Sequence, residues 1–250
     1  MTQISAVIIT KNEAKNIERC ILSLQNVVDE ILVLDNGSTD STIEIAKNLG
    51  ARVETTTWKG YSETKNYGNS LAVNNYILSI DADEALSEEL RNQIIAIKQS
   101  LRIDHAFQFN RLTNYCGTWI KHCGWYPDTK LRIWSKEAGK WQGEIHEEIK
   151  LEPFVKVAHL KGDLLHYSYY NIEEHYKQAD KFTTLTAKDA FEKGKKASFL
   201  KLVFAPVVKF TKAYIFQFGF LDGPMGFQVC RVSAYATFLK YKKLRQLHKS

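Results

Sequence analysis

Three acidic side chains directly follow an apolar segment, in the run Asp81-Ala82-Asp83-Glu84 after residues 76–80. The apolar segment predicts a buried strand, so the acids would lie at the rim of a sheet, where open α/β sheets bind ligands. Paired carboxylates suit Mg²⁺ or Mn²⁺, which such sites usually share with substrate phosphates. The turn can direct one carboxylate toward a metal and the other toward a sugar. The alternative is a solvated acidic turn that caps the next helix.

A further acid, Asp35, ends the apolar segment 30–34 and is followed by turn residues 36–40. Its carboxylate is a candidate acceptor of hydrogen bonds from a base or a ribose; alternatively it only stabilises the turn before a helix. This segment alone favours neither interpretation. The sequence has no glycine-rich dinucleotide fingerprint and no P-loop. Phosphate charge would therefore have to be met by a metal and basic side chains.

Residues 143–149 hold the third acidic candidate, Glu147. As a strand, this segment would place Glu147 on one face with Ile145 and Ile149. A carboxylate among apolar neighbours is poorly solvated and is a candidate general base. The alternative is a polar edge strand in which Glu147 belongs to a structural ion pair.

A single histidine, His166, lies in the apolar segment 164–168. A lone histidine beside a hydrophobic strand is more often a satisfied core residue than a ligand. Neutral imidazole is nevertheless a good ligand for Mn²⁺.

A regular alternation of elements is predicted to position these residues. Apolar segments predict strands at 4–9, 30–35, 53–58 and 76–80, and helical periodicity predicts helices between them. This order predicts a parallel sheet with right-handed crossovers, on whose rim Asp35 and Asp81 converge. From His105 onward, alternating patterns indicate antiparallel or mixed strands around an aromatic-rich loop, 115–134, which suits either a core or sugar stacking.

The composition sets limits on the architecture. At 250 residues with 44% hydrophobic side chains, the chain predicts one large domain or one domain with an appendage. No apolar stretch approaches the roughly 20 residues of a membrane-spanning helix, and we expect no secretory signal. The cysteines Cys20, Cys116, Cys123 and Cys230 have no CxxC spacing. Cys116 and Cys123 could pair, but without a secretory signal we expect free thiols.

The C-terminal segment, 196–250, differs from the first 195 residues in composition. Apolar and aromatic side chains alternate with lysines, and Asp222 is the only acid after Lys193. We interpret this segment as amphipathic basic helices at the surface of an anionic membrane. The alternative is ordinary packing on the core or at a dimer interface. A nucleic-acid partner is disfavoured, because arginine is sparse and no motif is present.

Taken in order, several motifs together resemble the family 2 glycosyltransferases, and within them the bacterial lipopolysaccharide-core glucosyltransferases. The resemblance covers essentially the whole chain. It is carried by residues 8–13, 35–40, 65–66, 81–84, 127–132, 143–148 and 219–223.

The resemblance implies the A-type glycosyltransferase fold, a Rossmann-like, mostly parallel sheet flanked by helices, as a nucleotide-sugar-binding catalytic domain over 1–195. A helical, basic-amphipathic extension would follow over 196–250. It also implies the following site: Thr10, Glu13, Asp35, Lys65 and Asp81 for the nucleotide-sugar, Asp83 for Mg²⁺ or Mn²⁺, His166 as a metal or phosphate contact, and Glu147 as the catalytic base. Many members have an Asp-rich pair where this chain has His146-Glu147-Glu148, so a one-residue shift would make Glu148 the base.

The implied reaction is the inverting transfer of a hexose, expected to be glucose, from a UDP-sugar to a hydroxyl of a lipid-linked or cell-surface glycan such as lipopolysaccharide core. We expect a cytoplasmic protein that binds the inner face of the cytoplasmic membrane. Two other classes stay open. A nucleotidyltransferase would be expected to carry a glycine-rich N-terminal loop with a basic residue, where this chain has Thr10-Lys11-Asn12-Glu13. A non-catalytic membrane-docking module would not need Asp81, Asp83 and Glu147.

Overall fold

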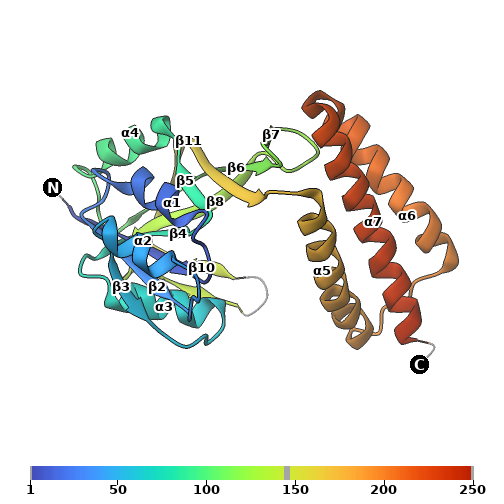
Figure 1. Cartoon of the computed structure of the whole chain (residues 1–250), viewed down its shortest axis with the longest axis horizontal. Helices are drawn as coiled ribbons and strands as arrows, with labels where there is room; N and C mark the ends of the chain where they lie inside the picture. The colour runs from blue at the N-terminus through green and yellow to red at the C-terminus, as the bar shows by residue number, and fades with distance from the viewer. Residues whose placement is uncertain (1, 144–146, 249–250) are drawn as a thin grey trace. The chain divides into compact units, whose positions relative to one another are not determined.

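The computed structural model describes residues 2–143 and 147–248. Contacts divide the chain into two compact units (Figure 1). We call Met1–Arg111 with Asp128–His166 the sheet unit, and Leu112–Pro127 with Tyr167–Ser250 the helical unit.

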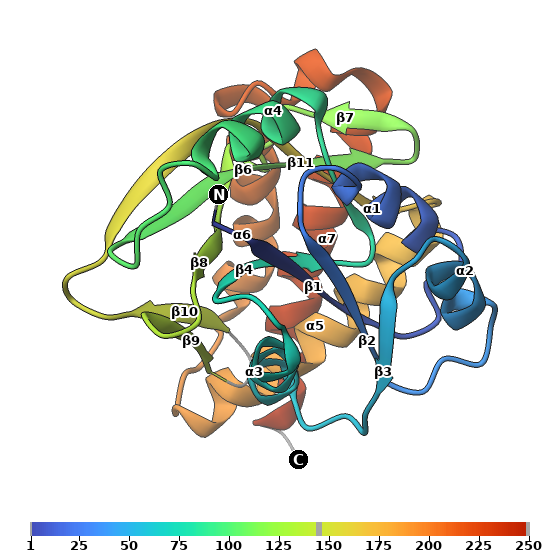
Figure 2. The same cartoon turned by 90° about the vertical axis from the view of Figure 1, so that its left-hand side faces the viewer.

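The first half of the sheet unit is a parallel βαβ array, as the sequence predicts. Strands run in the order β3-β2-β1-β4, which Figure 2 shows from one side of the unit. Thr10 pairs with Asp35, and Ile9 pairs with Asp81, so three strands end side by side at one edge. The elements are β1 (Ile4–Thr10), α1 (Ile17–Leu24), β2 (Glu30–Asp35), α2 (Thr42–Asn48), β3 (Arg52–Thr55), α3 (Tyr61–Leu71) and β4 (Tyr76–Asp81).

The second half extends this sheet with antiparallel pairs, which confirms the mixed pattern expected from His105 onward. The order continues from β4 through β8, β6 and β11 to β5, and β9 and β10 form a separate two-stranded ribbon. The elements are β5 (Glu84–Leu86), α4 (Glu88–Ile97), β6 (His105–Tyr115), β8 (Asp128–Ser135), β9 (Gly139–Gln142), β10 (Glu148–Leu151) and β11 (Lys156–Tyr169).

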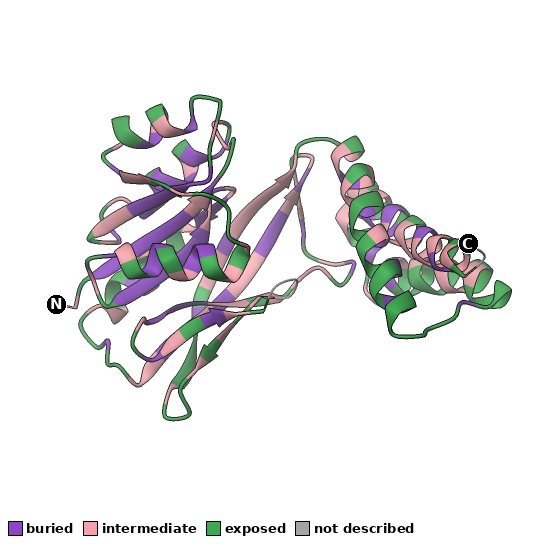
Figure 3. Ribbon diagram, turned by 90° about the horizontal axis from the view of Figure 1, so that it is seen from below, coloured by how far each residue is buried: buried purple, intermediate pink, exposed green. Residues whose placement is uncertain are grey.

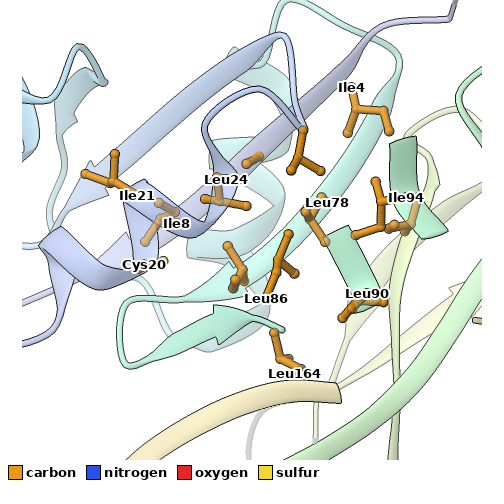
Figure 4. Close-up of a cluster of buried hydrophobic side chains, with 14 of the residues drawn as sticks. Ile4, Ile8, Cys20, Ile21, Leu24, Leu78, Leu86, Leu90, Ile94 and Leu164 are labelled. Carbon is orange, nitrogen blue, oxygen red and sulfur yellow. The ribbon is translucent and has the colours of Figure 1, made fainter. Parts of the chain in front are cut away.

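Apolar side chains cover both faces of the parallel strands, which explains their nearly continuous hydrophobic sequences. On one face, Leu78 of β4 packs with Leu24 of α1 and Ile94 of α4 (Figure 4). On the other face, Ile77 packs in a cluster that includes Trp134 of β8. The buried strands form the purple centre of the sheet unit in Figure 3. This two-sided core fixes the strand ends that carry the acids.

The helical unit contains three long helices, with the hairpin strand β7 (Thr118–Ile120) pairing with the end of β6. α5 and α7 lie side by side, and the Lys243 ammonium contacts the Asp180 carboxylate at 2.7 Å. α6 continues through Pro206, and the helical path breaks near Gly219. The elements are α5 (Ile172–Glu192), α6 (Phe199–Thr211), η1 (Lys212–Phe216), η2 (Gly219–Asp222) and α7 (Gly223–Leu247).

The predicted boundary at residue 195 does not coincide with the division by contacts. α5 belongs to the helical unit because it packs along α7, and residues 112–127 join it through the cluster around Tyr115 and Val229. All four cysteines are free, as predicted. Among the described residues, no helix is long and apolar enough to cross a membrane.

Candidate active site

Asp81, at the end of β4, is held by two cations. Its Oδ1 lies 3.4 Å from the Lys65 ammonium of α3, and its Oδ2 lies 3.2 Å from the Arg132 guanidinium of β8. Burial by itself raises the pKa of Asp81, but Lys65, Arg132 and more distant cations outweigh it and hold the pKa well below its usual range. Asp81 is therefore a fixed negative charge at the sheet edge.

Glu84, from the same acidic run, has a structural role. Its side chain is fully buried, accepts hydrogen bonds from Arg132 Nη2 at 2.8 and 3.1 Å, and lies 3.4 Å from Arg111 Nη1. The Asp81 backbone N–H also donates to Glu84, at 3.0 Å. Although burial lowers the pKa of Arg132, Glu84 and Asp81 raise it above its usual value. The network stiffens the turn and fixes the Asp81 carboxylate.

Asp83, two residues after Asp81, contacts a different partner. Its Oδ2 lies 3.2 Å from Nε2 of His166, which the pairing of His166 with Glu84 across β11 and β5 brings to the turn. A carboxylate and an imidazole fit Mg²⁺ or Mn²⁺ when substrate phosphates and water supply the other ligands. Among the described residues, no group of three or more His, Cys, Asp or Glu side chains forms a complete protein-only metal cage.

Buried oxygens without partners lie at the ends of β1 and β2. Asp35 Oδ2 accepts hydrogen bonds from the N–H groups of Gly37 and Ser38 at 2.8 and 2.9 Å. Its Oδ1 has no partner, and the same holds for Thr10 Oγ1 and Asn36 Oδ1. Asp35 therefore stabilises its turn with one oxygen and leaves the other for a ligand. Because buried polar atoms are normally satisfied, this group indicates a polar ligand.

Glu13 lies in the loop after β1. Its carboxylate accepts a hydrogen bond from Asn16 Nδ2 at 2.8 Å, and its backbone N–H donates to Thr42 Oγ1 at 2.8 Å. Burial raises the pKa of Glu13 above its usual value; the Asn16 bond opposes this, and the charges of Asp83 and others add to it. The negative charges of the acidic turn therefore contribute to the raised pKa of Glu13.

Glu147 meets the site through Lys65. It precedes β10 rather than lying within a strand, so the predicted strand face does not describe it; Ile145 and His146 lie outside the described residues. Glu147 Oε1 lies 3.3 Å from the Lys65 ammonium, the same group that contacts Asp81. Glu148 begins β10 opposite Gln142 and is exposed. Glu147 therefore forms an ion pair with Lys65, and through this shared ammonium it lies close to Asp81.

Packing of α3 on β9 explains where Lys65 lies. Its side chain is only 4% exposed, with the ammonium 4.4 Å from the centre of the Trp141 ring. Asn66 exchanges two hydrogen bonds with the Trp141 backbone, at 2.9 and 3.0 Å. Gly68 of the same helix lies close to β1, because an added Cβ would lie 2.8 Å from Val7 Cγ1. These contacts hold the Lys65 ammonium between the two carboxylates.

The structure thus brings Lys65, Asp81 and Glu147 together and pairs Asp83 with His166, while Thr10 and Asp35 end adjacent strands. Sequence reasoning missed the roles of Glu84, Arg111, Arg132 and Trp141. The one available signal was a charged residue, Arg132, inside the apolar segment 131–134. A buried arginine in such a segment needs a buried acidic partner.

This fold and site define an α/β protein that gathers acids, cations and unsatisfied oxygens at the ends of parallel strands. The family description "Glycosyl transferase family 2" matches residues 5–155, and the chain belongs to this family. The predicted α/β fold, a sheet flanked by helices and followed by a helical C-terminal segment, is confirmed.

Similar proteins include an uncharacterized glycosyltransferase of Rickettsia typhi, 37% identical over 99% of this chain and 88% of its own length. A lipopolysaccharide core biosynthesis glycosyltransferase, LpsC, of Rhizobium meliloti is 28% identical over 98% of this chain and 93% of its own. Among solved structures, glucosyl-3-phosphoglycerate synthase from Mycobacterium tuberculosis, in complex with Mn²⁺, uridine-diphosphate and glucosyl-3-phosphoglycerate, aligns at 22% identity and a TM-score of 0.40, covering 54% of this chain and 57% of that one.

Proposed function

We propose that this glycosyltransferase moves a hexose, glucose in the first instance, from a UDP-sugar to a hydroxyl of a lipid-linked or cell-surface glycan, with inversion at the anomeric carbon. The observation that carries the proposal is the arrangement of Thr10, Asp35 and Asp81 at one sheet edge, with unsatisfied buried oxygens on the first two. Neighbouring strand ends are where open α/β sheets bind nucleotides.

The nucleotide would lie over the ends of β1 and β2. Uracil and ribose both offer donors, and Asp35 Oδ1 and Asn36 Oδ1 are buried acceptors that lack them. Filling these positions removes the cost of leaving buried oxygens unpaired, which favours a ligand with matching donors. Glu13 and Thr10 would line the same pocket.

The diphosphate would lie near the acidic turn. Asp83 and His166 would hold Mg²⁺ or Mn²⁺, which when bound supplies Lewis-acid stabilisation of the leaving diphosphate. Lys65, with its ammonium fixed between two carboxylates, supplies positive charge on the nucleotide side. Asp81, fixed as an anion by Lys65 and Arg132, would accept hydrogen bonds from sugar hydroxyls.

Glu147 is proposed as the base. It would take the proton of the acceptor hydroxyl as the oxygen attacks the anomeric carbon from the face opposite the diphosphate, which inverts the configuration. Its Lys65 contact, at 3.3 Å, supports this role, because the same ammonium contacts Asp81, which is proposed to bind the donor sugar. Glu148 is the alternative base that the sequence leaves open.

The acceptor is proposed to be lipopolysaccharide core or a related lipid-linked glycan. The similarity to LpsC over nearly the whole chain supports this class. The enzyme would then work on the inner face of the cytoplasmic membrane, where surface binding raises the effective concentration of a lipid-linked acceptor.

The test is a panel of UDP- and GDP-sugars with Mg²⁺ or Mn²⁺, scored by thermal stabilisation and by release of the nucleoside diphosphate. We expect one UDP-sugar to stabilise the protein in a metal-dependent way, by about 2.7 kcal/mol at roughly 100 times its dissociation constant. Asp83→Asn should abolish the metal dependence, whereas Asp189→Asn, on the exposed surface of α5, should not. Release of pyrophosphate would identify a nucleotidyltransferase, and silence across the panel would contradict both enzyme assignments.

A further inference from the structure

The helix α6 presents an apolar face to solvent. None of its residues is buried. Five large side chains on its outer surface are exposed by 44 to 65%: Leu200, Val203, Phe204, Val207 and Val208. Their spacing places them on one side of the helix. Further exposed apolar residues follow in η1 and η2: Ile215, Phe216, Phe218, Phe220 and Leu221. Contiguous apolar surface of this kind marks an interaction site.

The exposed charged residues of α6 and of the segment that follows it have one sign. After Lys193 the only acid is Asp222, and its side chain is 5% exposed and occupied by His122, whose Nδ1 lies 2.7 Å away. The exposed charged residues of α6 and its continuation are Lys201, Lys209 and Lys212. The apolar face is thus flanked by cations, with no exposed acid within residues 193–248. This pattern complements an anionic lipid surface.

The start of α6 lies next to the ends of α5 and α7 (Figure 1), and residues there line a basic cavity. Its volume is about 290 Å³, and Lys196, Ala197, Arg245 and His248 line it. Arg245 donates to the Ala197 carbonyl at 3.3 Å and lies over the Phe199 ring, and His248 Nε2 donates to the Lys195 carbonyl at 2.9 Å. These contacts fix two of the three basic side chains, which suits a phosphate group.

We propose that α6 lies in the interface of an anionic membrane, with the Lys196–Arg245–His248 cavity binding the phosphate of a lipid head group. In this arrangement the apolar face enters the acyl boundary and the lysines remain at the head-group level. The inference deepens the proposed transfer to a lipid-linked acceptor and rests on it for its biological purpose.

A second copy of the chain is a poorer occupant of this face. A two-fold contact would bring the same patch of both copies together, so Lys201, Lys209 and Lys212 would approach the same residues of the partner. Like charges at an interface oppose association. An anionic bilayer complements both the apolar side chains of α6 and the positive charge of its lysines.

The test is flotation of the full chain with vesicles of phosphatidylcholine alone or mixed with phosphatidylglycerol. We expect binding to the mixed vesicles and little to the neutral ones. Val207→Asp should weaken binding about tenfold, because it places a charge on the apolar face. Lys196→Glu should weaken it about fivefold or more, by reversing one cation of the cavity. Matched exposed changes in the sheet unit, Ile103→Asp and Lys47→Glu, should bind as the parent protein does.

Three results would overturn the proposal. The first is absence of binding to anionic vesicles, or equal loss in the matched controls. The second is a dimer that Val207→Asp dissociates, without vesicle binding, which would make a second copy the occupant. The third is stabilisation by inorganic phosphate that Lys196→Glu removes, without vesicle binding, which would assign the cavity to a free anion. Nucleotide-sugar binding by the same variants, measured without vesicles, tests the transferase assignment separately.

Discussion

The two units differ in which side chains they bury and which they expose, and in each unit the arrangement costs free energy. The sheet unit buries charged groups: Glu84, Arg132 and Lys65 are all at most 5% exposed. The helical unit exposes apolar groups, and α6 buries none of its residues. Buried charge is tolerated only when it is paired, and a large exposed apolar surface usually marks an interaction site.

The sheet unit holds a polar site whose main buried charges are paired within that unit. The helical unit instead carries an apolar surface that is exposed. In the sheet unit the buried charges of Lys65, Glu84 and Arg132 have oppositely charged neighbours, and the buried atoms without partners include oxygens of Thr10, Asp35 and Asn36 at the strand ends. Such a site is preorganised for a small polar ligand. The apolar face of α6 is exposed among the described residues, and the partner proposed for it is an extended surface. The following predictions test this division, beginning with the largest effect.

Glu147→Gln should have the largest consequence if the polar site of the sheet unit performs the chemistry. Loss of a general base costs typically 10²–10⁴-fold in rate, while the amide keeps the size of the side chain. The measurement is the transfer rate to a glycan acceptor, together with donor binding by thermal shift. Donor binding should persist.

Glu148→Gln is the matched control, because it is the adjacent acid and lies exposed on β10. It should retain activity close to that of the parent protein. If Glu148→Gln were the inactive variant, the base would be Glu148. If both variants stayed active, the ion pair of Glu147 with Lys65 would be only structural.

Arg132→Met should produce the largest loss of stability. It leaves Glu84 buried without its main cation, and removing one partner of a buried pair costs about 3–5 kcal/mol. The free energy of unfolding in urea measures this. Lys130→Met, two residues earlier on the same strand and partly exposed, should change it by less than about 1 kcal/mol.

A double variant sharpens this test. Adding Glu84→Gln to Arg132→Met removes the unpaired buried charge and should restore part of the lost stability. A double variant as unstable as the sum of the two single variants would mean that shape, and not charge pairing, holds the turn.

The sequence predicts what depends on local patterns and on strand order. The runs of β1, β2 and β4 are continuous and apolar, and parallel pairing then brings Asp35 and Asp81 to one edge. The Arg132–Glu84 pair was not predictable, because it requires knowing how β8 lies relative to the acidic turn, about 50 residues away in sequence. The position of Glu147 was predicted from a strand that begins one residue later. The boundary at 195 followed composition, whereas α5 is assigned by its packing on α7.

The smallest predicted effect concerns two acids of the site whose pKa values move in opposite directions. The pKa of Glu13 is raised by burial, assisted by the charge of Asp83, whereas cations lower the pKa of Asp81. An acid with a raised pKa in the folded state binds its proton more tightly when folded. Its stabilising contribution is therefore present at low pH and is lost as pH rises through the folded pKa. For Asp81 the contribution is present above its unfolded pKa, about 3.9, and is lost as pH falls below it.

Glu13→Gln should accordingly raise the free energy of unfolding at pH 7, by less than about 1 kcal/mol, and this gain should vanish as pH falls to about 4. Asp81→Asn should do the reverse, lowering stability at pH 7 and approaching the parent protein at acid pH. Urea unfolding between about pH 2 and pH 7 measures both slopes, that of Glu13→Gln above about pH 4 and that of Asp81→Asn below it. A Glu13→Gln variant that is less stable than the parent at pH 7 would show that the Asn16 hydrogen bond outweighs the negative field of the turn. The opposite slopes, if found, mean that the sheet unit retains an acid at a cost in stability, which is expected of a residue kept for a ligand.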